Sequence, residues 1–195
     1  MKNKDFILSS LKESSETKLK MIDACAEDIQ KAIDLLADSF GKGAKLLLCG
    51  NGGSAADCQH LATEFMIRLN HEINRPAIPA IALTTDTSNL TAGGNDIGFE
   101  NVFARNVQGL GAAGDVLLAV STSGNSPNVV KAVEMARHKG MKVIGFLGGT
   151  GGKLKALCDV PIVIPTSNVQ RIQEGHITAG HIIFESVELN MYGND

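Results

Sequence analysis

His60 and Glu64 stand four residues apart in the run DCQHLATE. On a helix this step is about 40° of rotation and about 6 Å of rise, so both side chains would share one face. An imidazole and a carboxylate on one face can hold a metal ion or act as a general base. The alternative is an ordinary surface pair, which is the commoner use of this spacing.

A second polar group lies in the run RIQEGHITAGH at residues 171–181. Its residues Gln173 and His181 are eight positions apart, about 12 Å along a continuous helix, which is too far for easy convergence on one ion. They could meet if Gln173 precedes the first full turn, or if they come from different subunits. His71 and His138 lie beside charged or turn residues and are predicted to be solvated.

A glycine-rich loop, GNGGSAAD, occupies residues 50–57. Glycines let a backbone approach a ligand closely. Ser54 and Asp57 have the spacing of a capping box, which predicts a helix that begins here with free N–H groups able to face an anion. A plain tight turn is the alternative. The pattern is neither G-x-G-x-x-G nor a Walker A loop, which disfavours a nucleotide.

A hydroxyl-rich loop, STSGNSP, occupies residues 121–127. Pro127 suits the first position of a helix, and Ser126 would be its N-cap. Hydroxyls together with helix N–H groups can bind a phosphate dianion without any lysine. A serine-rich loop with a good cap is the alternative, but the position of this loop after a predicted strand favours phosphate binding.

The elements that carry these loops alternate along the chain. Continuous apolar runs predict five buried strands, at residues 45–49, 78–83, 115–121, 142–147 and 160–164. Helical patterns lie between and around them, at residues 5–40, 54–68, 100–110, 126–138, 154–158 and 169–191. This order predicts a doubly wound α/β domain with a parallel sheet, in which ligands bind beyond the carboxyl ends of the strands.

The whole chain, residues 1–195, reads as one domain, with a helical arm over residues 1–41 and an α/β core over residues 42–195. As one unbroken helix the arm would exceed about 50 Å, too long for a compact domain of this size. A break near Cys25 and Ala26, or a partner subunit, is therefore expected. Gly175 and Gly180 would let the last helix approach the sheet or a second subunit. We predict a symmetric homo-oligomer, a tetramer.

The composition limits the partners and the compartment. A formal net charge of −3, with scattered basic residues, gives no field that would attract nucleic acid or an anionic membrane. The N-terminus does not read as a signal peptide, and no apolar run reaches the roughly 20 residues of a membrane span. The cysteines form no C-x-x-C pair and are predicted to be buried thiols in the cytoplasm, at positions 25, 49, 58 and 158.

Taken together, the runs CGNGGSAADCQHLATE, PAIALTTDTS, GND, GDVLLAVSTSGNSPNV and RIQEGHITAGH resemble the phosphoheptose isomerases of the SIS (sugar isomerase) family. This resemblance implies a parallel sheet between helices and a homotetramer with active sites between subunits. It implies zinc as cofactor, with ligands His60, Glu64, Gln173 and His181. The acid/base pair would be Glu64 and His181. Gly175 and Gln170 depart from the family's usual residues near the site.

The resemblance also implies a set of substrate contacts, namely Asn51, Gly52, Gly53, Ser54, Glu64, Asn95, Asp96, Ser121, Thr122, Ser123, Ser126 and Gln173. The implied reaction converts sedoheptulose 7-phosphate to D-glycero-D-manno-heptose 7-phosphate through an enediol, the first step toward ADP-heptose for the lipopolysaccharide core. The alternative is a non-catalytic SIS protein that partners the bacterial replication initiator. Such relatives lack a glutamate at the position of Glu64. A SIS sugar-phosphate sensor would carry a DNA-binding domain, of which these residues show no sign.

Overall fold

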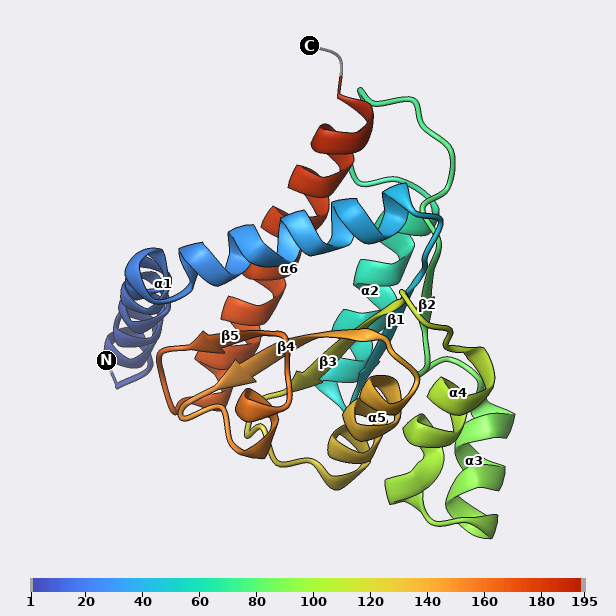
Figure 1. Ribbon diagram of the computed structural model, residues 1–195. Coiled ribbons are helices and arrows are strands. Elements are labelled where there is room, and N and C mark those ends of the chain that lie inside the picture. Colours follow the sequence, from blue (N-terminus) through green and yellow to red (C-terminus); the bar gives the residue numbers. More distant parts are fainter. Residues whose placement is uncertain (1, 194–195) are drawn as a thin grey trace.

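The computed structural model describes residues 2–193 and has a single sheet of parallel strands at its centre (Figure 1). The strand order is β2-β1-β3-β4-β5, so β1 and β3 are neighbours. This confirms the predicted five-stranded parallel sheet. The strands are β1 Leu46–Gly50, β2 Ala80–Ala82, β3 Val116–Ser121, β4 Lys142–Gly148 and β5 Val160–Ile164.

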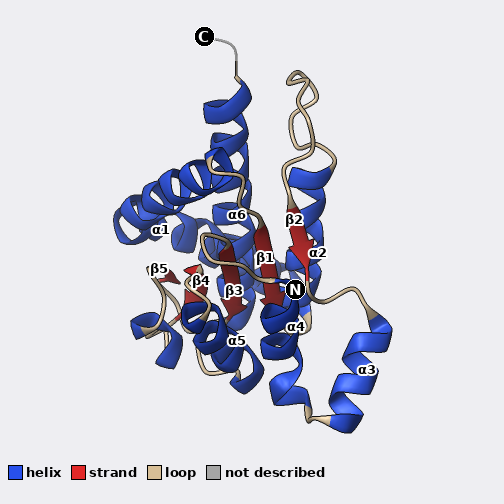
Figure 2. Cartoon of the chain, turned by 45° about the vertical axis from the view of Figure 1, so that its right-hand side comes forward, coloured by secondary structure: helices blue, strands red, loops and turns tan. Residues whose placement is uncertain are grey.

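Helices cover both faces of the sheet, which confirms the doubly wound α/β class (Figure 2). One apolar core joins the sheet to α1, α2 and α6, and a second joins it to α4 and α5. The α-helices are α1 Lys2–Gly41, α2 Gly53–Met66, α3 Thr87–Asp96, α4 Val102–Leu110, α5 Pro127–His138 and α6 Val169–Tyr192. Two 3₁₀ turns complete the list, η1 Phe99–Asn101 and η2 Lys153–Ala156.

Helix α3 was not predicted from the sequence. Its residues, TSNLTAGGND, are mostly weak helix formers and show no apolar periodicity. The helix is started instead by Asp86, whose side chain accepts a hydrogen bond from the backbone N–H of Asn89 at 3.0 Å. It buries none of its own side chains and packs against η1 and α4.

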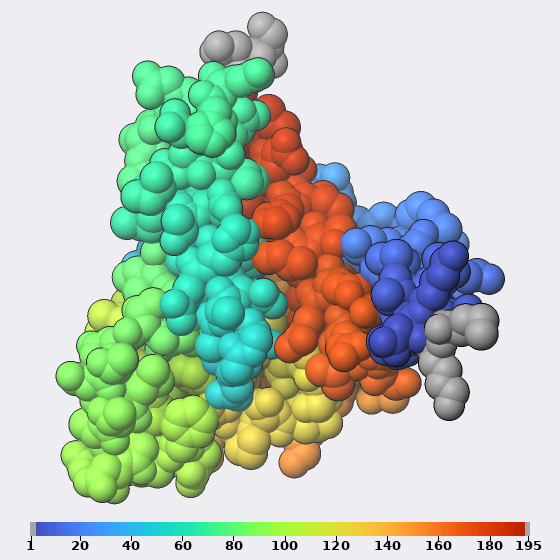
Figure 3. Space-filling model, turned by 180° about the vertical axis from the view of Figure 1, so that it is seen from behind, coloured from blue at the N-terminus to red at the C-terminus, as the bar shows by residue number. Residues whose placement is uncertain are grey.

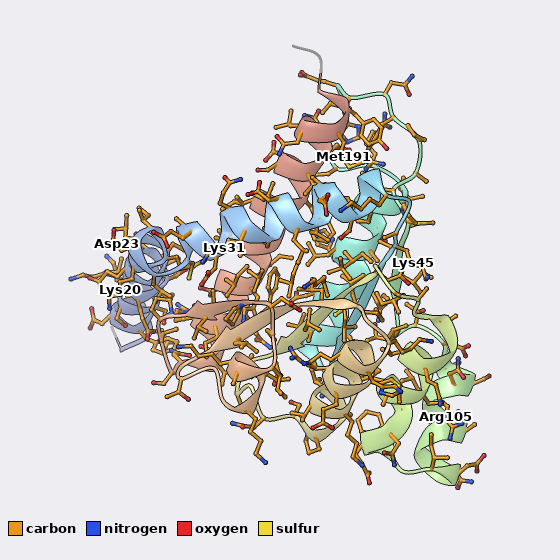
Figure 4. The ribbon with its side chains drawn as sticks, viewed as in Figure 1. Lys20, Asp23, Lys31, Lys45, Arg105 and Met191 are labelled. Atoms are coloured by element: carbon orange, nitrogen blue, oxygen red, sulfur yellow. The ribbon has the colours of Figure 1, made fainter. Side chains whose placement is uncertain are left out.

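Helix α1 is continuous from Lys2 to Gly41, so the predicted interruption near Cys25 and Ala26 is wrong. The helix does not run straight, however. Figure 1 shows two limbs that point in different directions, and Figure 4 labels Lys20 and Asp23 on the first of them. The second limb is packed into the core, whereas the first limb exposes large apolar side chains.

Polar contacts fix the first limb of α1 to the beginning of α6. The Ser14 hydroxyl donates to Glu174 Oε2 at 2.7 Å, and Asn168 Nδ2 donates to the Glu13 carboxylate at 3.1 Å. Arg171, which is almost fully buried, donates to the backbone oxygen of Ser10 at 2.5 Å. The arm therefore has a defined place on the fold even though its apolar face is not covered.

The small residues of α6 serve contacts within the chain. A Cβ atom added to Gly175 would lie 2.8 Å from a side-chain atom of Ile164 in β5, and one on Gly180 would lie 2.8 Å from Leu61 in α2. Both distances are too short for a real contact, so glycine is needed at these positions. Of the two alternatives for α6, close approach to its own domain is the one observed.

The cysteines are free thiols, as predicted, and three of them are fully buried. Burial raises the pKa of Cys25 to about 11 and that of Cys49 and Cys158 to about 12, so the thiols are unreactive near neutral pH. Among residues 2–193, no helix has the length and apolar character that crossing a membrane requires.

Candidate active site

The loop after β1 is shaped by glycine. Gly50 lies so close to Ser54 that an added Cβ would be 2.9 Å from the Ser54 Cβ. Gly52 has a φ of 56°, in the left-handed region, and is the N-cap of α2. The helix therefore begins at Gly53, one residue earlier than expected. The predicted capping box of Ser54 and Asp57 is wrong, because Ser54 is buried inside the first turn and no side chain caps this helix.

Asp57 instead lies near the histidines. Its Oδ2 atom is buried and has no hydrogen-bond partner among the described residues. Burial raises the pKa of this carboxyl group, and the nearby His60 and His181 partly oppose that shift. A carboxylate thus lies beside the imidazole pair, on the same helix as His60.

Three predicted site residues meet in one chain. His60 Nε2 lies 3.4 Å from Glu64 Oε1 and 2.9 Å from His181 Nε2. One ligand atom from each residue lies within 4.8 Å of the other two. Glu64 is mostly buried, with 15% of its side chain exposed, while His60 is half exposed. We call His60, Glu64 and His181 the trio.

The packing of α6 on α2 explains why His181 reaches the trio. The two helices run side by side in the same direction, since Gln173 lies over Gly53, Gly180 over Leu61 and Phe184 on Phe65. The two phenylalanine rings are stacked, with centroids 3.9 Å apart. Figure 3 shows α6 beside α2 on this face of the molecule.

This register answers the distance problem noted for the sequence. Glu64 and His181 come together without a second subunit, because α2 supplies the partners of His181. Gln173 lies two helical turns earlier, where its amide covers Gly53 at the start of α2. The structure therefore joins three of the four predicted metal ligands and places the fourth beside the glycine loop.

The donor set fits a zinc ion. Two imidazole nitrogens and a carboxylate oxygen are the ligands of several catalytic zinc sites. The Nε2 atoms of His60 and His181 can form their 2.9 Å contact as a hydrogen bond only if one of them carries a proton. When both are unprotonated, both nitrogens offer lone pairs, and with Glu64 they place three ligand atoms within 4.8 Å of one another, which suits a cation.

The hydroxyl-rich loop follows β3 and ends at α5. The hydroxyls of Ser121 and Ser126 are paired at 3.0 Å, and Ser123 Oγ accepts from the backbone N–H of Asn125 at 3.2 Å. Ser126 is the N-cap residue and Pro127 the first helical residue, as predicted, but the Ser126 side chain makes no capping bond. The hydroxyls of Ser126 and of the half-buried Thr122 lie in the loop at the N-terminus of α5. The N-terminus of a helix is a position that favours a bound anion.

A pair of carboxamides joins the two loops. Asn51 Nδ2 donates to Asn128 Oδ1 at 2.9 Å, and Asn128 Nδ2 donates to Asn51 Oδ1 at 2.8 Å. Asn128 is buried in the first turn of α5. Sequence reasoning missed it. The available signal was a polar residue directly after the hydroxyl-rich loop, which itself follows β3, the neighbour of β1.

The 3₁₀ turn η2 and the glycines before it contact the hydroxyl-rich loop. The backbone N–H of Leu154 donates to the Gly124 oxygen at 3.1 Å, and that of Lys153 donates to Asn125 Oδ1 at 3.0 Å. A Cβ on Gly124 would lie 2.0 Å from the Gly151 oxygen, so only glycine fits here. These contacts hold the turn that carries the hydroxyls in a fixed conformation.

Asn95 and Asp96 end α3 and are exposed. Their side chains bond to each other, with Asn95 Nδ2 donating to Asp96 Oδ1 at 2.7 Å. Across residues 2–193, no hydrogen bond joins either of them to the trio or to the two loops. The single chain thus does not bring these two predicted substrate contacts into the site.

Comparison with known proteins agrees with this arrangement. A family model described as SIS domain matches residues 11–148. A phosphoheptose isomerase from Chlorobaculum tepidum is 49% identical over 192 residues, which are 98% of this chain and 91% of that protein.

Two solved structures are similar along nearly the whole chain. One is a phosphoheptose isomerase from Neisseria gonorrhoeae, with a TM-score of 0.88 and 40% identity, covering 94% of this chain and 97% of that one. The other is a phosphoheptose isomerase from Francisella tularensis, with a TM-score of 0.92 and 36% identity, covering 96% and 99%. The chain belongs to the SIS domain family, among relatives that are phosphoheptose isomerases. It is an enzyme, a sugar-phosphate isomerase.

Proposed function

We propose that this enzyme converts sedoheptulose 7-phosphate to D-glycero-D-manno-heptose 7-phosphate. The observation that carries the proposal is the trio, which lies on α2 and α6 directly after the glycine loop. A carboxylate and two imidazoles suit proton transfer, and the hydroxyl-rich loop, which the Asn51–Asn128 pair joins to the glycine loop, suits a phosphate. The relatives named above support the choice of a heptose phosphate.

Glu64 would be the base. It removes a proton from C1 of the ketose, next to the C2 carbonyl, and the electron pair of the C–H bond forms the double bond of a 1,2-enediol. The same carboxyl group returns the proton to C2, because the two carbons are adjacent. His181 moves the balancing protons between the oxygens on C1 and C2, as an imidazole can near neutral pH. The product is the aldose.

Zinc is the proposed cofactor, and when bound it would polarise the substrate oxygens as a Lewis acid. The trio would hold it, and Gln173 stays the predicted fourth ligand. The amide of Gln173 lies on the loop side of the trio, over Gly53, which is the direction from which a sugar chain would enter.

The two loops would fix the ends of the substrate. The phosphate would bind the hydroxyls of Ser121, Thr122, Ser123 and Ser126 at the N-terminus of α5. The sugar chain would lie along the glycine loop, with contacts from Asn51, Gly52, Gly53 and Ser54. Asn95 and Asp96 would join the site from the edge of the fold, and they are the contacts for which an assembled enzyme matters most.

The wider setting follows from the same proposal. The reaction would be the first step toward ADP-heptose for the lipopolysaccharide core, in the cytoplasm. The enzyme would act as a homotetramer. No nucleic acid or membrane partner is proposed.

One assay tests the reaction. Metal-free enzyme is incubated with sedoheptulose 7-phosphate, with and without added zinc, and the products are separated by chromatography. Formation of a heptose 7-phosphate that increases with zinc supports both the reaction and the cofactor. Product formation at the same rate with and without zinc would contradict the proposal that zinc is the cofactor. No product under either condition, despite binding of the sugar phosphate, would favour a non-catalytic SIS binding protein.

A further inference from the structure

Arg75 and Glu188 form an ion pair that the proposed reaction does not use. Arg75 Nε lies 2.6 Å from Glu188 Oε1, and the side chains are only 1% and 0% exposed. Arg75 belongs to the loop between α2 and β2, which reaches the end of α6 (Figure 1). A buried pair of this kind is costly to desolvate and is weak evidence of stability by itself. Its other contacts indicate what it does.

The remaining arms of the guanidinium cap the end of α2. Arg75 Nη2 donates to the backbone oxygen of Glu64 at 2.8 Å, and Nη1 donates to that of Phe65 at 2.8 Å. Both carbonyls belong to the last turn of the helix, where they have no partner further along it. One side chain thus holds the backbone of the proposed base directly.

Glu188 carries the other half of the contact into α6. It stands seven residues after His181, close to two full helical turns, so both side chains project from nearly the same face. Its second oxygen, Oε2, accepts from the backbone N–H of Asn70 at 3.0 Å. Both carboxylate oxygens are therefore occupied, and the α2–β2 loop is fastened to α6 at two points.

The geometry points to Arg75 as a positioning residue that sets the axial register of α2 against α6, and through it the geometry of Glu64 and His181. The apolar contacts between these helices, Gly180 on Leu61 and Phe184 on Phe65, bring α2 and α6 close together. The directional bonds of Arg75 to Glu64, Phe65 and Glu188 resist sliding. This inference rests on the proposed function only in its zinc-affinity and catalytic readouts.

The fold offers a matched control in a second ion pair. Lys45 and Asp115 form a second ion pair, at 2.5 Å, with side chains 27% and 5% exposed. Burial alone would raise the pKa of the Asp115 carboxyl group, but the hydrogen bonds from Lys45 and Ala112 lower that pKa overall. This pair lies where β1 and β3 begin, and among the described residues its hydrogen bonds reach only Lys45, Ala112 and Asp115, not the trio. Its loss should affect stability alone.

The experiment compares Arg75→Met with Lys45→Met, since each replaces the cation of an ion pair by an uncharged chain. Zinc affinity of the metal-free proteins is measured by competition with a chelator, beside kcat, KM and thermal unfolding. We expect Arg75→Met to lose roughly 10- to 100-fold in zinc affinity and in kcat, the usual effect of a group that orients ligands. Lys45→Met should unfold at a lower temperature with both quantities unchanged.

Arg75→Lys keeps the test decisive if Arg75→Met does not fold. Lysine preserves the charge beside Glu188 but cannot reach Glu188 and both carbonyls together. An intermediate loss of zinc affinity supports positioning through the backbone of Glu64. Folded Arg75→Lys or Arg75→Met with wild-type zinc affinity and kcat overturns it, as does an equal loss in Lys45→Met.

A third readout separates this inference from the proposed function. In metal-free protein, the ¹⁵N chemical shifts of the His60 and His181 rings report their mutual contact at 2.9 Å. These shifts should change in Arg75→Lys and stay constant in Lys45→Met, even if the wild-type enzyme binds no zinc and isomerises no heptose. Unchanged shifts in a folded Arg75→Lys protein would overturn the positioning role by themselves.

Discussion

The carboxylate of Glu64 combines two properties that a proton-transferring base needs. It is mostly withdrawn from water, and it lies 3.4 Å from an imidazole nitrogen of His60. Glu64→Gln retains the size and most of the hydrogen bonding of the side chain but removes the charge. We expect turnover to fall by roughly two to four orders of magnitude, the usual contribution of a general base.

Steady-state turnover of sedoheptulose 7-phosphate checks this expectation. Glu134→Gln, at an exposed position on α5, is the matched control and should behave like the wild type. Zinc content must be measured for both proteins, because Glu64 is also a proposed ligand. Turnover of Glu64→Gln within a factor of a few of wild type would exclude Glu64 as the base.

His176 makes stability depend on pH. Its ring is fully buried and stacked on Phe146, and its Nε2 contacts the backbone oxygen of Leu147 at 2.9 Å. Burial lowers the pKa of His176 from 6.5 to about 4. Between these values the unfolded chain binds a proton that the folded protein excludes, so the free energy of unfolding falls as the pH falls. The loss from this group is on the order of 3 kcal/mol.

Chemical denaturation at several pH values from 7.5 to about 4.5 measures this loss. His176→Gln can keep a donor near the Leu147 oxygen but has no group that titrates. Its free energy of unfolding should decline less between about pH 6.5 and 4.5 than that of the wild type. Parallel curves for the two proteins would show that His176 does not cause the dependence.

Residue types and local spacing predicted part of this site. The four-residue step from His60 to Glu64 was enough to place both on one helical face. Asn128 and Arg75 could not be found in this way, because their partners Asn51 and Glu188 are 77 and 113 positions away. The capping-box prediction failed for a related reason, since the close approach of Ser54 to Gly50 draws the serine into the core.

At the scale of elements, β1 and β3 were predictable because each is a continuous apolar run buried on both sides. Helix α3 was not, because neither propensity nor periodicity marks it, and one side-chain cap at Asp86 starts it. The convergence of α2 and α6 could not be predicted from the sequence either. It depends on Gly180 fitting over Leu61, a contact between distant segments.

The hydroxyl-rich loop gives a prediction for an element as a whole. Replacing Ser121, Ser123 and Ser126 together by Ala removes the hydroxyls and leaves the N-terminus of α5. Substrate affinity should fall strongly, and inorganic phosphate should cease to compete. Isothermal titration with substrate and with phosphate measures both effects, and Ser15→Ala on α1 is the control. Unchanged affinity would place the phosphate elsewhere.

Stability should change little in that triple variant. The cost of about 1 kcal/mol expected for loss of a helix cap does not apply, because the Ser126 side chain makes no capping bond. Ser121 and Ser126 bond to each other, and removing both partners leaves no buried group unpaired. Thermal unfolding checks this point and separates a binding defect from a folding defect.

At the scale of the whole molecule, the trio belongs to one chain. Mixing Glu64→Gln with His181→Ala subunits under conditions that exchange chains should therefore restore no activity, because neither chain has a complete trio. From the sequence alone, these two residues could also have come from different subunits. In that case, mixing the two variants would restore activity. Recovery of turnover above the sum of the two separate variants would contradict the one-chain trio.

The exposed face of α1 leads to the last prediction, which concerns assembly. Large apolar side chains on its first limb are left in water in the single chain, namely Phe6, Ile7, Leu8, Leu11, Leu19 and Ile22. A groove of about 370 Å³ continues this surface between α1 and α6, where Met21, Ile22 and Ile182 line it. Monomers seldom expose an apolar surface of this kind, so a second copy of the chain is expected to cover it.

A tetramer of the 20.5 kDa chain has four times that mass, about 82 kDa, and light scattering at micromolar concentration should show it. The double variant Leu11→Asp, Leu19→Asp puts charges on the exposed face and should yield smaller species. Leu110→Asp, at an exposed leucine at the end of α4, should remain tetrameric. A wild-type monomer with full activity would refute the assembly. The double variant could be a folded monomer that retains the trio but has lost turnover. Because Asn95 and Asp96 lie apart from the trio in one chain, that result would indicate them as the residues that assembly brings into the site.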